Sequence, residues 1–410
     1  MTRYFILIIF LVFFVGTQHS NAQNNLSDFL LTSFEDLNTR GFDKSIDFLS
    51  PKNYRLPLIE DIEFRYGNDE FTNEDQQYAL RFRPGNPWKI RRNNALFNAT
   101  KKELNIRKRL QYKENLEDRY EIAADYILKT QLLDIQKQHY YIIAKRVEVL
   151  GSNMESALFD AKDFVEAKLD QVDALNNQEE ANTSLIGSKN TIISILQNTG
   201  FDWSSNTLIS VSAIDSISDH IIAKEIPSLE LDLISQEIEV AKSEVRLEKA
   251  DFNLGFIQTE YFPFKDRNSD YGVSFGLSIP LFKANKNQIA ERKLDEIELN
   301  GELLTEQYQD SVKRIIEYEY LKNLIIQHES LLEQIDQLDL QKLSRDLSQI
   351  VDNNPLSLLK IQEGALKLKE LELRSYRRVI DQYLEFLTTF NALTQLPLTN
   401  YISEQLESLE

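Results

Sequence analysis

The sequence of 410 residues contains no cysteine. This absence excludes disulfide bonds, Cys-ligated zinc, iron–sulfur clusters and thiol nucleophiles, and it argues against a lipoprotein anchored through an N-terminal cysteine. Four scattered histidines make an imidazole metal site unexpected, so we predict neither a metal nor a cofactor. The 46 basic residues against 65 acidic ones give a net charge of −19, which argues against nucleic-acid binding because phosphate neutralisation needs clustered Lys and Arg.

Proline is missing from two long tracts. None lies between Pro87 and Pro227, and none lies between Pro280 and Pro355. Because proline costs a helix interior about 3 kcal/mol, these tracts, rich in Leu, Ile, Glu, Lys and Gln, predict two regions of long helices.

Long hydrophobic runs are also scarce. Residues 1–22 read as a signal peptide, with Arg3, an apolar stretch over 4–15 and small residues before the expected cleavage after Ala22. The apolar stretch is shorter than the roughly 20 residues that a membrane-spanning helix needs, and no later run reaches that length. We therefore expect an exported protein without a transmembrane helix.

The sequence contains an internal duplication. Three residues recur 193 positions later in the same order, namely Tyr78, Phe82 and Pro87 as Tyr271, Phe275 and Pro280. The order of such matches favours a twofold repeat. The predicted first repeat covers 23–200, with a helix, a β-hairpin at about 58–88 and long helices at 93–150 and 152–198. An inter-repeat segment covers 201–226. The predicted second repeat covers 227–410, with a helix, a hairpin at about 250–282 and long helices at 286–350 and 356–396.

Apolar and polar residues alternate along the predicted strands, which predicts a sheet with two different faces. The expected apolar face, which would meet lipid if the strands lie in a membrane, comprises Phe64, Leu80, Phe82, Leu254, Phe256, Val273, Phe275 and Leu277. The expected polar face, which would then line a lumen, comprises Glu63, Arg65, Arg81, Arg83, Ser274 and Ser278. A small water-soluble sheet packed on the helices fits the same alternation.

Two features favour the membrane alternative. A strand over 271–282 would be about 40 Å long, enough for a tilted span, and aromatic residues gather near the strand ends as in interfacial girdles. A membrane barrel must be closed, because open edges leave backbone groups unpaired in lipid. Four strands cannot close a useful barrel, so the membrane alternative requires oligomers that share one.

Several segments resemble a known family. The stretch YGVSFGLSIPLFKANKNQIAERKLDEIELN, the segments that begin at Ile226 and Ser357, and the duplicated strand–strand–helix–helix order are similar to the TolC-like outer membrane efflux proteins. The resemblance implies a homotrimer with a coiled-coil-like helical barrel and a shared transmembrane β-barrel of four strands per subunit. It also implies a passive exit duct for small molecules or protein, located in the outer membrane of a Gram-negative bacterium with a periplasmic helical extension. A periplasmic adaptor (membrane fusion) protein and an inner-membrane pump would be its partners.

The same resemblance places the breaks between the long helices at a periplasmic entrance that contacts the adaptor. The candidates there are Gly151, Ser152, Asp160, Asp163, Asp352, Asn353, Asn354, Ser357 and Lys360. Ser357 and Lys360 stand where the family often has carboxylates, so an acidic gate is not expected at that place. Turn-forming residues that merely end a helix would give the same pattern at the breaks.

Two rival interpretations have less support. Gly272, Ser274 and Gly276 match the G-x-S-x-G pattern of a hydrolase, but that motif needs a strand-to-helix turn and a histidine partner, and here it lies within a predicted strand. We therefore predict no catalytic residue and no enzyme. An exported periplasmic coiled-coil adaptor or scaffold without a pore is the alternative function.

Overall fold

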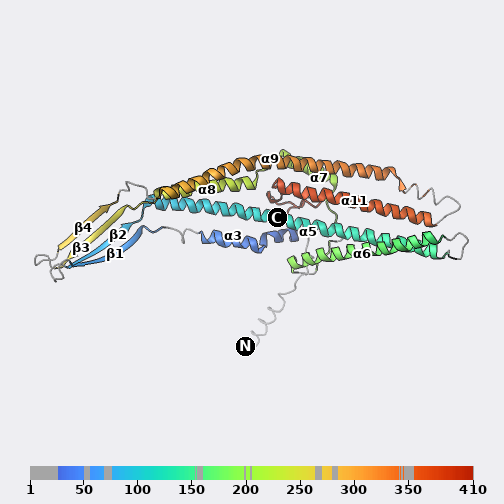
Figure 1. Cartoon of the computed structure of the whole chain (residues 1–410), viewed down its shortest axis with the longest axis horizontal. Helices are drawn as coiled ribbons and strands as arrows, with labels where there is room; N and C mark the ends of the chain where they lie inside the picture. The colour runs from blue at the N-terminus through green and yellow to red at the C-terminus, as the bar shows by residue number, and fades with distance from the viewer. Residues whose placement is uncertain are drawn as a thin grey trace, which may run out of the picture. The chain divides into compact units, whose positions relative to one another are not determined.

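In a computed structural model, the described part of the chain is mostly helical, with one four-stranded antiparallel sheet (Figure 1). The structure describes residues 26–49, 56–68, 76–152, 154, 160–197, 200–203, 206–263, 270–278, 285–340, 342, 345 and 355–409, so the expected signal peptide lies outside it. The strands are β1 (Ile59–Asn68), β2 (Gln76–Pro84), β3 (Gly255–Phe262) and β4 (Asp270–Leu277). The helices are α2 (Leu26–Leu31), η1 (Thr32–Glu35), α3 (Leu37–Phe48), α5 (Pro87–Ser152), α6 (Ala161–Leu196), α7 (Val211–Ala223), α8 (Leu229–Ala250), α9 (Lys286–Gln337), α11 (Pro355–Thr389) and η3 (Ala392–Thr394). None of these described helices is long and apolar enough to cross a membrane.

The chain divides into two compact units. Unit 1 comprises Met1–Glu35, Lys113–Ile226 and Ile315–Glu410, and unit 2 comprises Asp36–Tyr112 and Pro227–Arg314. Each unit draws on both halves of the sequence, so the units do not coincide with the two predicted repeats. The long helices α5 and α9 contribute residues to both units.

Polar contacts join the helices of unit 2. The Gln236 side chain of α8 donates a hydrogen bond of 3.1 Å to the Ala99 carbonyl of α5, and Arg107 of α5 pairs with Glu237 of α8 at 2.5 Å. Two helical turns further along α8, Glu244 pairs with Arg292 of α9 at 3.3 Å. Within this unit α8 therefore lies alongside both α5 and α9 (Figure 1).

A buried asparagine begins the helix that follows the first hairpin. The Asn86 Oδ1 accepts hydrogen bonds from the Trp88 and Lys89 backbone N–H groups at 2.9 and 3.3 Å. Its Nδ2 donates to the Ala250 and Phe252 carbonyls at the end of α8, at 2.7 and 2.9 Å. Because an asparagine cap followed by proline suits a helix start, α5 begins at Pro87, earlier than the residue 93 given by the sequence pattern.

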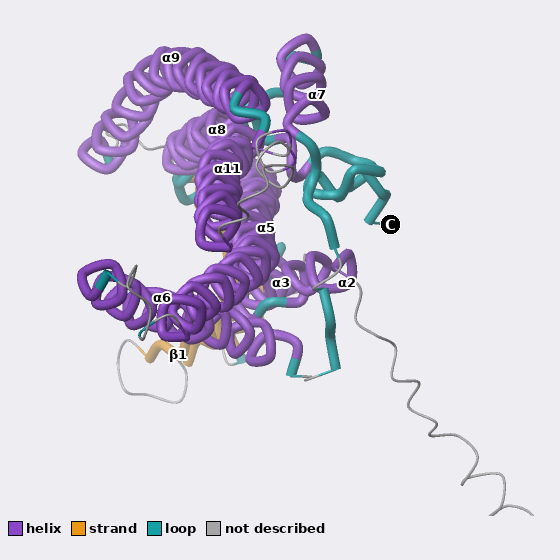
Figure 2. The backbone as a smooth tube through the Cα atoms, turned by 90° about the vertical axis from the view of Figure 1, so that its right-hand side faces the viewer, coloured by secondary structure: helices purple, strands orange, loops and turns teal. Residues whose placement is uncertain are grey.

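The core of unit 1 is built around an aromatic cluster. Trp203 is buried against Phe29 and Phe201, with ring centroids 5.1 and 4.8 Å apart. Residues 201–226, expected only as a packing segment, contribute Phe201, Trp203 and the helix α7, which carries the buried Ile214. Figure 2 shows α7 and the loops that lead to the C-terminus beside α11. Apolar side chains of α5, α9 and α11 complete the core, among them Leu116, Tyr120, Ile127, Leu321, Leu324, Ile380, Tyr383 and Leu387.

Helix α6 packs through small residues. Its buried positions Ala167, Ala174, Ala181 and Ser188 recur every seven residues, as in helices that wind about a partner helix. Ala167 contacts the cluster of Val147 and Leu150 on α5, and the Ser188 hydroxyl donates to Asp125 of α5 at 2.7 Å. The side chains of Val165, Leu169 and Val172 remain exposed on this helix.

Candidate functional site

The strands pair in the order β1-β2-β3-β4, and every pairing is antiparallel. Four tyrosines stand directly opposite one another across the whole sheet, namely Tyr66, Tyr78, Tyr261 and Tyr271. Residues that pair directly in an antiparallel sheet share a face, so the register assigns each strand residue to one side.

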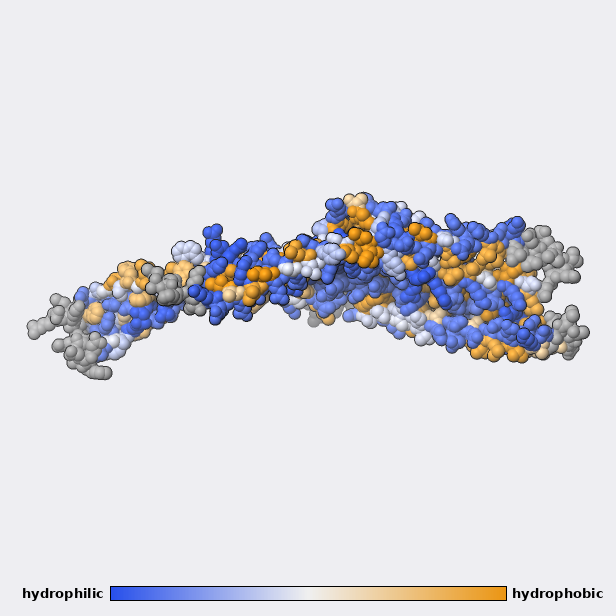
Figure 3. Space-filling model, turned by 45° about the horizontal axis from the view of Figure 1, so that its top comes forward, coloured by the Kyte–Doolittle hydropathy of each residue, from blue (hydrophilic) through white to orange (hydrophobic). Residues whose placement is uncertain are grey.

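One face of the sheet is apolar and largely exposed. It carries the row of Phe64, Leu80, Thr259 and Val273 and the row of Ile62, Phe82, Ile257 and Phe275. Phe275 exposes 74% of its surface and Val273 exposes 62%, and Leu277 continues the same side of β4. Figure 3 shows apolar side chains on the surface of this part of the chain. A contiguous exposed apolar face of this kind indicates a surface that meets lipid or another protein.

Phe256 lies on the opposite face from the one expected. It pairs with Gly276, and the Arg81 guanidinium lies over its ring, 3.8 Å from the centroid. The expectation that Phe256 shares a face with Phe275 is therefore wrong. Phe256 and Ile257 are consecutive apolar residues, so the pattern alone could not show which of them shares that face.

Leu254 precedes the strand and does not extend its alternation. The strand begins at Gly255, whose φ of +108° lies in the left-handed region that favours glycine. A Cβ at that position would lie 1.8 Å from the Gly276 carbonyl oxygen. The half-buried Leu254 thus stands outside the register, which does not assign it to the apolar face as predicted.

The other face of the sheet is a network of charged and polar side chains. Glu63 lies 2.7 Å from Arg65 and 2.9 Å from Arg83. Arg81 donates to Gln258 at 2.7 Å and lies 3.8 Å from Glu63. The structure thus brings together the predicted residues Glu63, Arg65, Arg81 and Arg83.

The network extends to β4 through Glu260. Its Oε1 accepts hydrogen bonds from Gln258 at 2.6 Å and from Ser274 at 3.2 Å. Ser274 therefore lies in the middle of a strand and not at a strand-to-helix turn. Its hydroxyl is hydrogen-bonded to a carboxylate. Ser278 follows β4, and its backbone N–H donates to the Leu254 carbonyl at 3.4 Å. The polar face is consequently one connected set of cross-strand contacts.

A separate, charged cavity of about 610 Å³ lies in unit 1, where α5, α6 and α11 meet. Its lining residues are Arg146, Leu150, Asp163, Glu166, Asp170, Leu356, Ser357, Lys360, Glu363, Gly364 and Lys367. Three of the predicted entrance residues, Asp163, Ser357 and Lys360, thus line one cavity. Arg146, Asp170, Glu363 and Lys367 were not among the predictions. For them the sequence offers only the i,i+4 spacing of Glu363 and Lys367.

An ion-pair cluster forms the buried side of this cavity. Arg146 and Glu363 are 2.9 Å apart and expose only 10% and 12% of their side chains. Arg146 also pairs with Asp170 of α6, and Glu363 lies 2.7 Å from Lys367. His139, Lys367 and Arg146 together lower the pKa of Glu363 to about 2, against the effect of burial, which raises it. Glu363 therefore stays charged at neutral pH, and the ion pairs of Arg146 with Glu363 and Asp170 tie α5, α6 and α11 together.

The other predicted entrance residues lie at helix ends near this cavity or outside the described ranges. Gly151 and Ser152 end α5, and a Cβ on Gly151 would lie 3.6 Å from the Phe164 ring of α6. Asp160 caps α6, since its carboxylate accepts hydrogen bonds from the Lys162 and Asp163 backbone N–H groups at 2.8 and 3.4 Å. Asp352, Asn353 and Asn354 lie outside the described residues. In the described part of the chain, no group of three or more His, Asp or Glu side chains could hold a metal ion.

Comparisons with known proteins identify the architecture. No protein-family model and no curated protein matches the sequence. Solved structures do match. Superposition on CusC, a protein studied for its folding and transmembrane channel formation, gives a TM-score of 0.65 with 11% identity and covers 90% of this chain and 92% of that chain. Superposition on the open state of the Neisseria gonorrhoeae MtrE outer membrane channel gives a TM-score of 0.58 with 11% identity. It covers 93% of this chain and 91% of that chain. Superposition on the outer membrane protein VceC from Vibrio cholerae gives a TM-score of 0.58 with 13% identity. It covers 90% of this chain and 98% of that chain. The chain therefore has a mainly helical fold with a small antiparallel sheet. This is the fold of the TolC-like outer membrane efflux proteins, as the sequence predicted.

Proposed function

We propose that this chain is a subunit of an outer-membrane exit duct, a passive channel in a multipartite efflux or export system of a Gram-negative bacterium. The single observation that carries this proposal is the two-faced sheet. One face exposes apolar side chains, and the other joins its charged residues in a hydrogen-bonded network. Such a sheet suits a wall with lipid on one side and water on the other. The fold similarity to outer membrane channels supports the same function.

The open edges of the sheet argue for a homotrimer. In the described residues, β1 and β4 each pair on one side only, and open edges in lipid leave backbone groups unpaired. Three copies of a four-stranded sheet would give 12 strands, with β1 of one subunit beside β4 of the next. The 10 residues of β1 and the 9 of β2 fall within the roughly 9 to 11 that a tilted membrane strand needs, and β3 and β4, with 8 each, are one residue shorter.

The helices support the same assembly. Exposed apolar side chains of α9 include Leu294, Ile297, Leu304 and Tyr308 in unit 2 and Ile315 in unit 1. Their steps of 3, 7, 4 and 7 follow a coiled-coil spacing, so a second copy of the chain is the occupant that fits this stripe. We propose that these side chains are buried between subunits.

The sheet residues then take specific roles. The row of four tyrosines would lie at a membrane interface, and the apolar rows that contain Phe64, Leu80, Phe82, Val273, Phe275 and Leu277 would face lipid. Glu63, Arg65, Arg81, Arg83, Ser274 and Ser278 would face the lumen. The duct needs no catalytic residue, and the hydrogen bond of Ser274 to a carboxylate gives no support to a hydrolase.

We further propose that the helix ends around the charged cavity of unit 1 form the periplasmic entrance and contact an adaptor protein that links the duct to an inner-membrane pump. The cavity offers side chains of both charges, with Asp163 and Glu166 on α6 and Lys360 and Lys367 on α11. A partner with a complementary pattern could bind there with both charge types paired.

The decisive experiment compares two neighbouring residues on opposite faces of β4. Phe275→Asp places a charge on the apolar face and should prevent assembly in the outer membrane, whereas Ser274→Ala should leave assembly intact. Fractionation of envelope membranes followed by native mass in detergent measures both, and the unmodified protein should appear at about three times the subunit mass. A soluble periplasmic monomer, or unimpaired outer-membrane assembly of Phe275→Asp, would contradict the proposal.

A further inference from the structure

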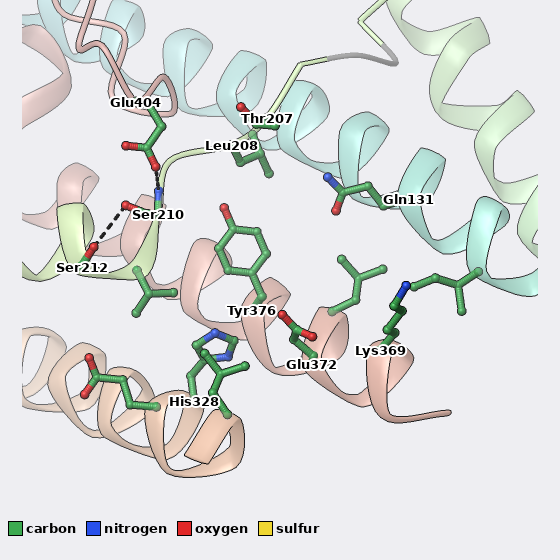
Figure 4. Close-up of a pocket in the computed structure, with 15 residues that line it drawn as sticks. Gln131, Thr207, Leu208, Ser210, Ser212, His328, Lys369, Glu372, Tyr376 and Glu404 are labelled. Carbon is green, nitrogen blue, oxygen red and sulfur yellow. Dashed lines mark hydrogen bonds between the residues drawn. The ribbon is translucent and has the colours of Figure 1, made fainter. Parts of the chain in front are cut away.

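A second cavity in unit 1 belongs neither to the sheet nor to the charged entrance cavity. It has a volume of about 670 Å³ and lies between α5, α9, α11 and the segment that leads into α7 (Figure 4). This volume falls within the range of about 300 to 1,000 Å³ typical of small-molecule sites. It is large enough for a ligand with one aromatic ring and a substituted amine.

One wall of the cavity is an aromatic pair. The rings of His328 and Tyr376 are tilted by 44° with centroids 6.1 Å apart, and both residues line the cavity (Figure 4). His328 is only 4% exposed, and its Nδ1 lies 3.1 Å from the Ser375 hydroxyl. The Tyr376 hydroxyl donates to the Ile209 carbonyl at 2.6 Å, which holds the ring in place. The partly buried Tyr376 ring, packed against the buried His328, is therefore a fixed surface on which a cation or an aromatic ring can stack.

The side chains that line this cavity include more carboxylates than ammonium groups. Three carboxylates, from Glu329, Glu372 and Glu404, line the cavity together with one ammonium group, that of Lys369. Glu404 accepts a hydrogen bond from the Ser210 backbone N–H at 2.5 Å. Among the described residues, neither Glu329 nor Glu372 makes an ion pair. Three negative charges against one positive charge leave a net charge of −2 that a cationic ligand can neutralise.

The histidine does not offset this negative charge. Burial lowers the pKa of His328, while the nearby Glu372 and Glu329 act in the opposite direction. At neutral pH the ring is therefore uncharged and does not repel a cation. The remaining wall is aliphatic and includes Ile135, Leu208, Val211, Leu332 and Leu373.

We propose that this cavity binds a small organic ammonium ion, with the cationic head beside the carboxylates of the cavity and the apolar body against the His328–Tyr376 pair and the aliphatic wall. Carboxylates, an aromatic pair and an apolar wall within one cavity are the features that bind substituted ammonium ions. The site is separate from the lumen-lining residues proposed above.

The test uses the full-length protein in detergent and two probes with one ring and opposite charges, benzyltrimethylammonium and benzenesulfonate. Isothermal titration calorimetry, with a titration into the same micelles as reference, should give benzyltrimethylammonium a dissociation constant of about 1 mM or tighter. Benzenesulfonate should give no binding heat. Raising the salt from about 0.05 to 0.5 M should weaken the ammonium binding, because salt screens the carboxylates.

Matched variants identify the site. Glu329→Gln and Glu372→Gln should each weaken binding by about threefold to tenfold, because each removes one of the charges beside the ligand. Glu333→Gln changes an exposed carboxylate of α9 that does not line the cavity, so its affinity should equal that of the unmodified protein. Far-UV circular dichroism shows whether each variant is folded. Equal binding of the two probes, no heat above the micelle reference, or an equal loss in the Glu333 variant would overturn the proposal.

Discussion

Replacement of Glu363 by glutamine tests the buried ion-pair cluster of unit 1 most directly. The Glu363 carboxylate lies 2.9 Å from Arg146 and 2.7 Å from Lys367. Glutamine keeps the size of the side chain and removes its negative charge. Among the described residues, the Arg146 guanidinium, with 10% of its side chain exposed, then retains Asp170 as its ion-pair partner.

The magnitude follows from the lowered pKa of this carboxyl group. A change from 4.5 to about 2 is a difference of about 2.5 pKa units, and each unit corresponds to about 1.36 kcal/mol. The charged form of Glu363 therefore contributes about 3 kcal/mol to the free energy of unfolding. Removal of one partner of a buried ion pair costs about 3 to 5 kcal/mol, which agrees in size.

The sign of the pH dependence is fixed by the direction of the shift. Because the pKa of Glu363 is lower in the folded state, its contribution is fully present above pH 4.5 and is lost as the pH falls toward 2. Between pH 5 and pH 3 the unmodified protein should lose about 2 kcal/mol of this contribution. The Glu363→Gln variant has no carboxyl group at this position and should not show that part of the loss.

Urea unfolding of the protein in detergent, followed by far-UV circular dichroism at pH 7, 5 and 3, measures this difference. The control is Glu370→Gln on the same helix. Glu370 pairs with Arg374, which is 72% exposed, so its loss should cost about 0.5 kcal/mol or less. A loss below about 1 kcal/mol for Glu363→Gln at pH 7 would refute the reasoning. A difference between the variant and the unmodified protein that stayed the same from pH 7 to pH 3 would refute it equally.

Two further predictions concern unit 2. Asn86→Ala removes the cap of α5 and two hydrogen bonds to the end of α8, and should lower the free energy of unfolding by about 2 kcal/mol, measured by urea unfolding. Exposed Asn105→Ala is its control, and equal losses in both variants would contradict this role. Gly276→Ala should weaken the heat stability of the assembled protein on gels, because its Cβ would lie 2.3 Å from the Phe256 ring. Phe256→Ala in the same chain should partly restore it, and a failure to do so would reject the assigned face of Phe256.

Patterns among residues close in the sequence predicted which segments form helices and which form strands. Alternation identified the strands around Phe64 and Phe275, and the missing proline identified the long helices. Element ends were less well predicted where a single side chain or backbone conformation decides them. The helix predicted over 286–350 ends as α9 at Gln337, just before Asp339, which has a φ of +36°. The helix predicted over 356–396 ends as α11 at Thr389, before Asn391 with a φ of +55°.

The face of Phe256 shows where a pattern loses its information. Alternation gives the period of a strand, but two consecutive apolar residues fit either phase equally well. The pairing of Phe256 with Gly276 and the contact with Arg81 decide between the two phases. In the same way, no pattern in the sequence relates Arg146 to Glu363, which are 217 positions apart.

The sequence alone determined the features that depend on near neighbours and on composition: the helical tracts, the two-faced strands, the lack of cysteine chemistry and the resemblance to TolC-like proteins. Only the tertiary structure decided the features that depend on distant residues. These are the division into two units that each combine both halves of the chain, the buried cluster of Arg146 and Glu363, and the cavity beside His328 and Tyr376. The physical reason is that periodicity and propensity act along the chain, whereas burial, ion pairing and cavities depend on which segments pack together.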